Sequence, residues 1–212
     1  MTVPDEIGES AVRRARAAIE RALGPRFGEN PPSDQPAWTR PSGAFVTLRT
    51  YPEGALRGCI GFPLPIHPLS RAIDLAAVAA ATEDPRFRPV THGELDAVTV
   101  EVSLLTRPEP VPGASAAERE RAIVIGRDGL IVSGYGTSGL LLPQVAVEEG
   151  FDAPTFLAAA CEKAGLVPNA WKRSATRVER FSASVFAEAA PRGAVVRAMS
   201  TPSEPTGGPL AH

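Results

Sequence analysis

Hydrophobic residues recur along the chain with the two periods that distinguish helices from strands. Residues 5–23 place alanine and isoleucine at helical spacing, with arginine and glutamate between them, and Gly24-Pro25 ends the pattern. Residues 69–84 show the same spacing up to Pro85, and the residue before a proline disfavours helical backbone. Both segments are therefore predicted to be helices.

Strict alternation of apolar and polar residues predicts strands elsewhere. It is clearest in residues 96–105, where valine and leucine share one face while Glu101 and Ser103 lie on the other. Residues 44–51 are also predicted to form a strand, and residues 177–188 show the same alternation as residues 96–105. We therefore expect at least three strands, one of them with a distinctly polar face.

Shorter elements are predicted between the last two of these strands. Residues 122–134 contain two β-branched runs around a glycine-rich turn, a pattern typical of a hairpin. Residues 143–149 begin with a proline and residues 153–164 follow an aspartate, as helices do. Because helices and strands do not alternate regularly, we expect an α+β fold with mainly antiparallel pairing rather than a doubly wound parallel sheet.

Composition places the chain among ordinary globular proteins. Its 212 residues are 43% hydrophobic and 22% charged, enough for one large domain, or for one domain with a smaller lobe. The net charge of −2 gives no overall attraction to nucleic acid or to an anionic membrane. The acidic start is not a signal peptide, and the two distant cysteines fit neither a zinc site nor a disulfide framework. We expect a cytoplasmic protein without a bound metal.

Proline and glycine are concentrated in three segments. Residues 24–43 and 106–115 are interpreted as ordered loops or connections between lobes. Residues 190–212 have no periodic apolar positions to bury and are predicted to form a disordered tail.

The stretch LRGCIG, residues 56–61, places Cys59 between two glycines that cannot shield it. If the stretch is extended, Arg57, Cys59 and Gly61 point to one side. A cation beside a thiol favours the thiolate, and flanking glycines let a ligand or another segment approach closely. This pattern suits a reactive cysteine. The alternative is a tight strand crossing where only small residues fit, and from the residues alone we favour that alternative.

A cysteine nucleophile usually works with a base. His67 and His92 lie in loops without an evident partner, which is more typical of solvated histidines. Glu101 is open to two interpretations. It could lie on the wet side of a half-exposed sheet, or line a cleft as a general base or as a partner of Arg57.

Other motifs carry less weight. Cys161 lies on an apolar helical stripe, so we expect it in the core. The sequence GYGTSG (134–139) matches a dinucleotide-binding fingerprint, but the next helix begins too late to support that function. Trp171 and the basic residues after it could stack a base and hold phosphate, although a solvated charged surface is the simpler explanation.

Several motifs together resemble one known family. LRGCIG is similar to the signature of the AMMECR family, named after the AMME syndrome chromosomal region. Further similar segments follow in the family's order: ATEDPRF (81–87), EVSLLTRPE (101–109), GLIV (129–132), GLLLPQVAVE (139–148), CEKAGL (161–166) and FSASVFAE (181–188). The resemblance covers nearly the whole chain except its ends.

This resemblance implies a single domain over residues 1–189, with a larger α+β lobe and a smaller lobe that includes about residues 106–136. The signature segment would border a cleft between the lobes. The family's activity is not established. Its prokaryotic members are often encoded beside, or fused to, a Memo-type protein and a radical-SAM protein, which implies a shared modification pathway.

The family motifs fall on a defined set of residues here. They mark Cys59, Arg57 and Glu101 as catalytic candidates and the following as binding candidates: Gly58, Ile60, Gly61, Ser103, Arg86 and Gln144. Two positions depart from the family. Asp128 stands where histidine is common, which weakens any mechanism that needs that histidine, and Phe151 stands where tryptophan is frequent.

The leading hypothesis is an enzyme, or an enzyme component, that acts on an unknown small molecule or a modified residue in the cleft. Cys59 would supply the thiolate, Arg57 would lower the thiol pKa or bind an anionic group, and Glu101 would transfer a proton. Backbone amides at 58–61 could hold developing negative charge, and no cofactor is required. A non-catalytic adaptor that docks a partner protein is the alternative, and an RNA-binding module comes third.

Overall fold

The fold is described from a computed structural model, in which residues 3–24, 36–113 and 115–198 are described. These residues group into two compact units. The first unit runs to Arg107 and resumes at Ser184, and the second spans Pro108–Ala183. The strand β7 (Arg177–Glu188) contributes residues to both units.

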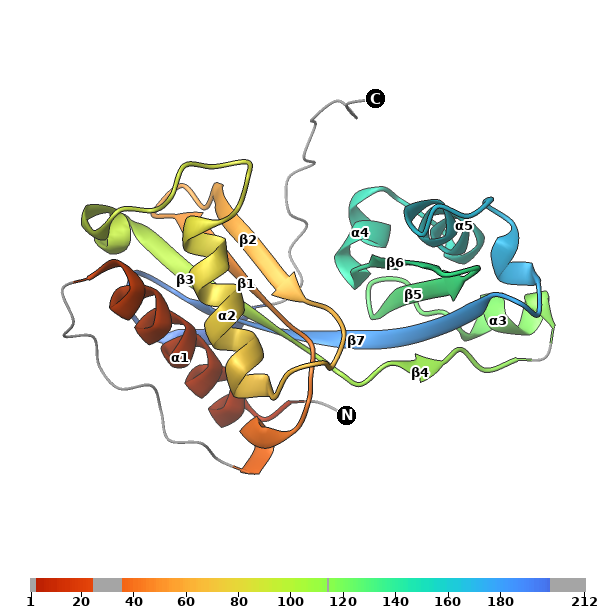
Figure 1. Cartoon of the computed structure of the whole chain (residues 1–212), viewed down its shortest axis with the longest axis horizontal. Coiled ribbons are helices and arrows are strands. Elements are labelled where there is room, and N and C mark those ends of the chain that lie inside the picture. Colours follow the sequence, from red (N-terminus) through yellow and green to blue (C-terminus); the bar gives the residue numbers. More distant parts are fainter. Residues whose placement is uncertain (1–2, 25–35, 114, 199–212) are drawn as a thin grey trace. The chain divides into compact units, whose positions relative to one another are not determined.

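The first unit combines helices with an antiparallel sheet (Figure 1). In the sheet, β1 (Ala44–Thr50) lies between β2 (Leu56–Phe62) and β3 (Val98–Leu105), and β8 (Val195–Ala198) pairs with the C-terminal part of β7. The helices of this unit are α1 (Asp5–Leu23), the 3-10 helix η1 (Pro36–Thr39), α2 (Leu69–Thr82) and the 3-10 helix η2 (His92–Ala97).

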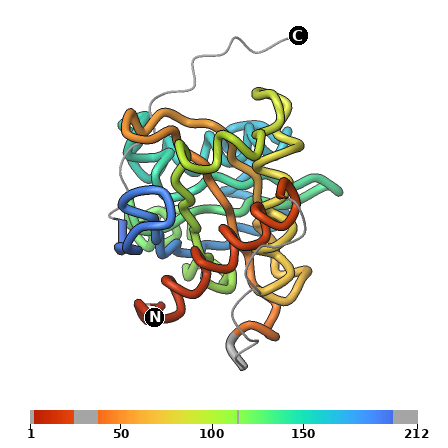
Figure 2. Tube along the Cα trace, turned by 90° about the vertical axis from the view of Figure 1, so that its left-hand side faces the viewer, coloured from red at the N-terminus to blue at the C-terminus, as the bar shows by residue number. Residues whose placement is uncertain are grey.

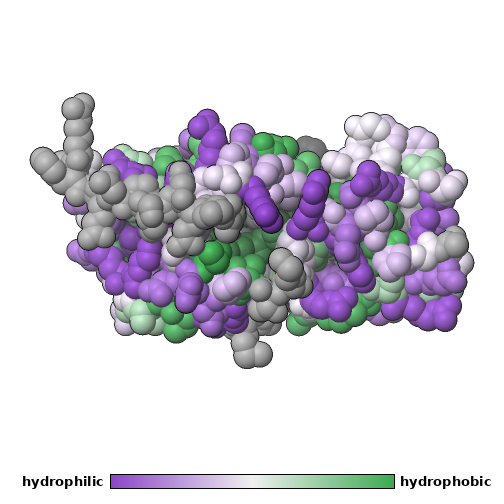
Figure 3. Space-filling view, turned by 90° about the horizontal axis from the view of Figure 1, so that it is seen from below, coloured by the Kyte–Doolittle hydropathy of each residue, from purple (hydrophilic) through white to green (hydrophobic). Residues whose placement is uncertain are grey.

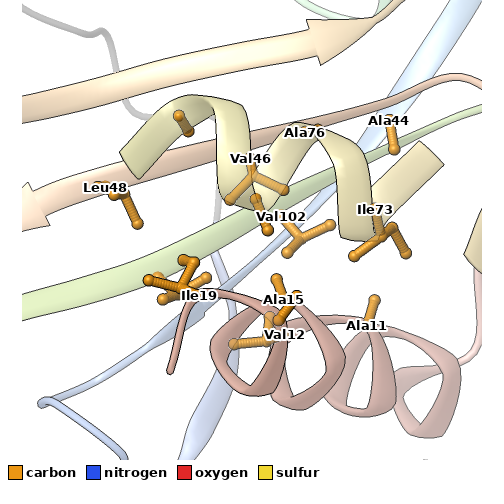
Figure 4. Packing of buried hydrophobic residues seen from close by; sticks show 14 of the residues in the cluster. Ala11, Val12, Ala15, Ile19, Ala44, Val46, Leu48, Ile73, Ala76 and Val102 are labelled. Carbon is orange, nitrogen blue, oxygen red and sulfur yellow. The ribbon is translucent and has the colours of Figure 1, made fainter. Parts of the chain in front are cut away.

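The core of this unit lies between α1, α2 and one face of the sheet. The two helices lie side by side in both views of the chain (Figures 1 and 2) and contact each other. Fully buried side chains such as Val46, Leu48 and Val102 project from the strands toward Ala15 and Ile73 on the helices (Figure 4). The alternation read from the sequence thus gives the sheet one apolar face, which the helices cover.

A buried ion pair ties the first helix to the end of β7. Arg16 donates to the carboxylate of Glu188 and to the carbonyl oxygens of Leu95 and Val98, the latter at 2.7 Å. The same carboxylate accepts the backbone N–H of Val100. Each charged group is therefore satisfied, which a buried ion pair requires because desolvation is expensive.

The second unit packs helices against a second set of antiparallel strands. Its buried cluster includes Phe156, Cys161 and Trp171, and α5 contacts both strands of the β5–β6 hairpin. Its elements are β4 (Glu109–Pro110), α3 (Ala116–Ala122), β5 (Asp128–Gly134), β6 (Thr137–Leu141), α4 (Pro143–Glu148), α5 (Ala153–Lys163), the 3-10 helix η3 (Ala170–Lys172) and the N-terminal part of β7.

The structure confirms the α+β class with antiparallel pairing, and also the placement of Cys161 in a core. The cleft between two lobes stays a prediction. No helix in the described ranges is long and apolar enough to cross a bilayer. The surface shown in Figure 3 has hydrophilic residues beside smaller hydrophobic areas.

The hairpin predicted at 122–134 was wrong. Ser115 and Glu118 form a reciprocal capping box at the start of α3, which ends at Ala122, and the first β-branched run after it, residues 123–125, belongs to a loop and turn instead of a strand. Only β5 is a strand, and it pairs with β6 through a turn at Tyr135 and Gly136, both with positive φ. The GYGTSG segment is therefore a hairpin turn.

The predicted tail also begins too early. Residues 195–198 form β8 and pair with β7 in register from Val185 to Glu188, so the prediction was wrong for this part. The rest of that prediction falls on residues 199–212, which lie outside the described residues.

The close approach of α2 to β2 depends on Gly58. A Cβ at this position would lie 2.2 Å from the carbonyl oxygen of Ala80 in α2, closer than real contacts allow. The obstructing atom belongs to the helix backbone, so it cannot rotate away. Gly58 therefore sets the spacing between helix and strand.

We predict that Gly58→Ala lowers the free energy of unfolding by about 3 kcal/mol, because helix and strand must separate to accept the methyl group. Urea denaturation measures this difference. Gly93→Ala is the matched control, since a Cβ there meets no atom within 4 Å. Equal stability of the two variants would contradict the packing argument.

Candidate functional site

The polar face of the first unit's sheet brings three candidate side chains into one row. Thr47 in β1 pairs with Cys59 in β2 on one side and with Glu101 in β3 on the other. Directly paired residues on neighbouring strands project from the same face. We call Cys59, Thr47 and Glu101 the Cys59 row. It lies on the sheet face opposite to Val46 and Val102, which point into the helix-covered core.

The backbone of Cys59 is held from the side opposite to β1. Its N–H donates to Asp84 Oδ2 at 2.8 Å, and its carbonyl oxygen accepts from Arg86 Nη2 at 3.4 Å. Arg86 in turn binds the Asp84 carboxylate through Nε and Nη2, at 3.0 and 2.8 Å. We call Asp84 and Arg86 the edge clamp, because β2 is the terminal strand of the sheet.

The edge clamp perturbs the pKa of its own carboxyl group. The Asp84 side chain is only 2% exposed. The guanidinium of Arg86, followed by backbone N–H donors, lowers the Asp84 pKa to about 2. The clamp is therefore ionised throughout the physiological range.

Arg57 is turned to another partner. The register of β1 with β2 shifts at this point, so that Leu48 faces Gly58 and Arg49 faces Leu56, which leaves Arg57 as the extra residue of a β-bulge. Its guanidinium binds Glu94 Oε1 at 3.1 Å and the carbonyl oxygen of Arg88 at 2.9 Å. The expectation that Arg57 acts on the thiol was wrong, because its guanidinium is bound to Glu94 and Arg88 and the charges that act on the sulfur come from Arg86, Glu101 and Asp84.

The thiol of Cys59 is not poised as a thiolate. Burial raises its pKa, and a hydrogen bond from the Thr47 hydroxyl at 3.4 Å together with the charge of Arg86 only partly offsets this. Glu101 and Asp84 raise it further. The cation that acts on the sulfur is thus Arg86 rather than Arg57.

Glu101 is a partly buried carboxyl with one loose ionic partner. Its Oε2 lies 3.5 Å from Arg49 Nε, and its side chain is 18% exposed. Burial raises its pKa, and the charge of Arg49 only partly counteracts that effect. Ser103, two residues along the same strand face, is buried beside it. Glu101 therefore protonates more readily than an ordinary surface glutamate.

The glycines around Cys59 are explained by packing. Gly58 accommodates the backbone of α2, and a Cβ at Gly61 would lie 2.3 Å from the ring of Phe45. Ile60 packs against the helix-covered core. The small residues of the signature therefore admit neighbouring protein groups, while the cysteine between them keeps partial exposure.

Other residues singled out in the sequence have their own surroundings. Gln144 is the second residue of α4 and belongs to the second unit, so its role as a binding residue stays a prediction. His67 packs edge-on against Phe62, with ring centroids 5.2 Å apart. Asp128 is buried and accepts hydrogen bonds from Arg127 and from the N–H of Val124, so it anchors the start of β5.

Two further features of the second unit bear on the alternatives. Phe151, where the family often has tryptophan, packs partly buried against the second unit's core. Trp171 is 2% exposed, so its ring is not free to stack on a base. Lys172, the basic residue directly after it, has its ammonium group 5.1 Å from the centroid of the Trp171 ring.

Thr47 and Arg49 were not identified from the sequence. Thr47 and Arg49 belong to β1, which lies between the strands of Cys59 and Glu101 in the sheet but comes before those two residues in the sequence. The available signal was the pair of polar residues, Thr47 and Arg49, two positions apart between apolar residues of β1. In the described part of the chain, no group of three or more histidine, cysteine, aspartate or glutamate side chains could hold a metal ion.

We predict that the edge clamp makes stability depend on pH in the acid range. Because the Asp84 pKa falls on folding to about 2, its contribution of about 2 kcal/mol is complete above the unfolded pKa near 4 and is lost as pH falls toward 2. Denaturation at several pH values should show wild type and Asp84→Asn converging there. Glu83→Gln, an exposed neighbour, serves as the control, and a constant gap between wild type and Asp84→Asn would refute the assignment.

The chain is similar to a set of archaeal proteins over most of its length. It is 54% identical over 200 residues to a protein of Thermococcus gammatolerans, an alignment that covers 92% of this chain and 97% of that protein. It is 50% identical to protein PYRAB00100 of Pyrococcus abyssi, with the same coverage.

A solved structure has the same fold. The crystal structure of the uncharacterized protein PH0010 from Pyrococcus horikoshii matches with a TM-score of 0.79 and 50% sequence identity, covering 93% of this chain and 98% of that one. The family model described as AMMECR1 matches residues 12–186, which include the Cys59 row and the edge clamp. The chain therefore belongs to the AMMECR1 family.

Proposed function

We propose that this protein is an enzyme, or a component of one, that acts on a small molecule or a modified residue at the Cys59 row. The observation that carries the proposal is the row itself. A thiol and a carboxyl group, both partly buried, flank a hydroxyl on one face of three paired strands. A merely solvated sheet face would have no need to desolvate ionisable groups.

Glu101 is the acid–base group of this proposal. Its raised pKa brings proton exchange closer to neutral pH, where a general acid or base is most effective. Arg49 limits the shift and orients the carboxylate from the neighbouring strand. Substrate groups would meet Glu101 from the exposed side of the sheet.

Cys59 contacts the substrate as a neutral thiol and becomes nucleophilic only after losing its proton. The Thr47 hydroxyl fixes the direction of the sulfur by donating to it. Substrate binding, or a partner that brings a positive charge, would have to assist ionisation, because burial keeps the free thiol protonated. This replaces the sequence-based role of Arg57 as the activating cation.

The proposed partners follow from the family resemblance. A Memo-type protein and a radical-SAM protein would act in the same modification pathway, and the substrate of the Cys59 row would be made or consumed by one of them. The cleft expected beside the signature would hold that substrate.

We predict that Cys59→Ala abolishes function while Cys161→Ala preserves it. The assay is complementation of a strain that lacks its own copy of this protein, read by metabolite profiling. Cys161 is the matched control because it is the other cysteine and is fully buried in the second unit. Full complementation by a folded Cys59→Ala protein would contradict the proposed function.

Glu101→Gln should give a protein that is more stable but inactive. A carboxyl whose pKa is raised on folding loses stability as pH rises through its titration, so the neutral amide removes that penalty at pH 7. Thermal unfolding at pH 5 and pH 8 compares the two proteins, with the larger gain at pH 8. An active Glu101→Gln protein, or one destabilised equally at both pH values, would argue against the acid–base role.

A second candidate function is a protein-binding adaptor. It is favoured by the proline-rich loop after β2, where Leu64 is 45% and Ile66 is 65% exposed. Exposed apolar side chains mark a contact surface where they form a contiguous patch, and these two stand two residues apart in one loop.

The adaptor hypothesis makes its own prediction. Ile66→Asp should abolish co-purification with a Memo-type or radical-SAM protein from the same genome, whereas Cys59→Ser should leave it intact. Retained binding by Ile66→Asp would exclude this loop as the contact surface.

A further inference from the structure

We infer that the edge clamp, Asp84 and Arg86, positions Cys59 in place of a neighbouring strand, and that Arg86 supplies the positive charge that acts on its sulfur. This inference rests on the proposed function only where it assumes that the Cys59 thiol takes part in a reaction. The contacts of Asp84 and Arg86 with Cys59 do not depend on that function.

The first support is the direction of the Cys59 backbone groups. They bind Asp84 and Arg86 rather than β1, so Thr47 and Cys59 form the non-hydrogen-bonded kind of antiparallel pair, in which side chains lie closer together. This agrees with the contact between the Thr47 hydroxyl and the sulfur. The clamp therefore acts where the next strand of a sheet would.

The second support is the rigidity of the clamp. Asp84 accepts hydrogen bonds from the N–H of Arg86 at 3.1 Å and from its guanidinium through two nitrogens. Bidentate pairs of this kind fix both position and orientation. The guanidinium also lies 5.5 Å from the centroid of the Phe87 ring. A side chain held at both ends in this way fixes the carbonyl of Cys59.

The third support is the set of charges that face the sulfur. Arg86 is the cation among them, and Glu101 and Asp84 are the anions, while Thr47 contributes a hydrogen bond. Arg57 is occupied by Glu94 and by the carbonyl of Arg88. Removing Arg86 leaves two carboxylates around the thiol, whereas removing Arg57 leaves the balance of charge unchanged.

The test measures the rate at which iodoacetamide alkylates Cys59 between pH 6 and pH 10, in a full-length Cys161→Ala protein. Arg86→Gln should move the midpoint of the rate profile to higher pH and slow alkylation roughly three- to fivefold at pH 8. Arg86→Lys keeps the positive charge and should therefore leave the midpoint close to its wild-type pH. Arg57→Gln is the matched control and should leave it in place.

A shifted midpoint in Arg57→Gln, or an unchanged midpoint in Arg86→Gln, would overturn the assignment of the positive charge to Arg86.

A second measurement tests the hydrogen bond that Asp84 accepts from the Cys59 backbone. Hydrogen exchange of the Cys59 amide in Asp84→Asn should accelerate at least tenfold beyond any acceleration seen at the amides of β3, which report the change in global stability, because the acceptor of the Cys59 N–H is weakened. Unchanged exchange at Cys59 would overturn the clamp.

Both measurements are made without any assay of function. A protein in which Cys59→Ala still complements would end the proposed function but leave the clamp standing. Conversely, if substitution of Asp84 and Arg86 changes neither the alkylation of Cys59 nor the hydrogen exchange of its amide, this inference is wrong. The role of the Cys59 row would then still be decided by complementation.

Discussion

The close packing of α2 on β2 is the constraint on which the candidate site depends. At Gly58 the strand passes so near the carbonyl of Ala80 that no side chain fits between them. This contact brings the end of α2, and the residues directly after it, to the free edge of the sheet. Asp84 can reach the N–H of Cys59 only because the helix ends there.

The signature segment is thus held on three sides by different kinds of interaction. Packing against α2 fixes Gly58, hydrogen bonds from the edge clamp fix the backbone of Cys59, and Arg57 binds the 3-10 helix through Glu94. Most residues of the segment serve to place the chain. The side chain of Cys59 remains partly exposed and lies in the row on the polar face.

That arrangement changes how the chemistry should be understood. An activated cysteine usually shows a lowered pKa, whereas burial raises the pKa of Cys59 and that of Glu101. In the free protein, the uncharged form of each group is therefore favoured more than it would be in water. The same sheet face also carries Arg49. Such a face is suited to exchange protons with a bound molecule rather than to react spontaneously with solvent electrophiles.

The sequence by itself determined helices α1 and α2, strands β1, β3 and β7, the α+β class and the polar side of β3, because periodicity reports which face of a helix or strand is buried. It identified Cys59 and Glu101 as catalytic candidates but paired the thiol with Arg57, since the partners of a side chain cannot be read from alternation. The prediction also missed α3, although Ser115 and Glu118 form a capping box at its start, and it placed the hairpin within residues 122–134 when the turn lies at Tyr135. Only the tertiary structure placed Thr47 between the two candidates and Arg86 against Cys59, because strand pairing and helix packing join residues whose separation in the chain carries no signal.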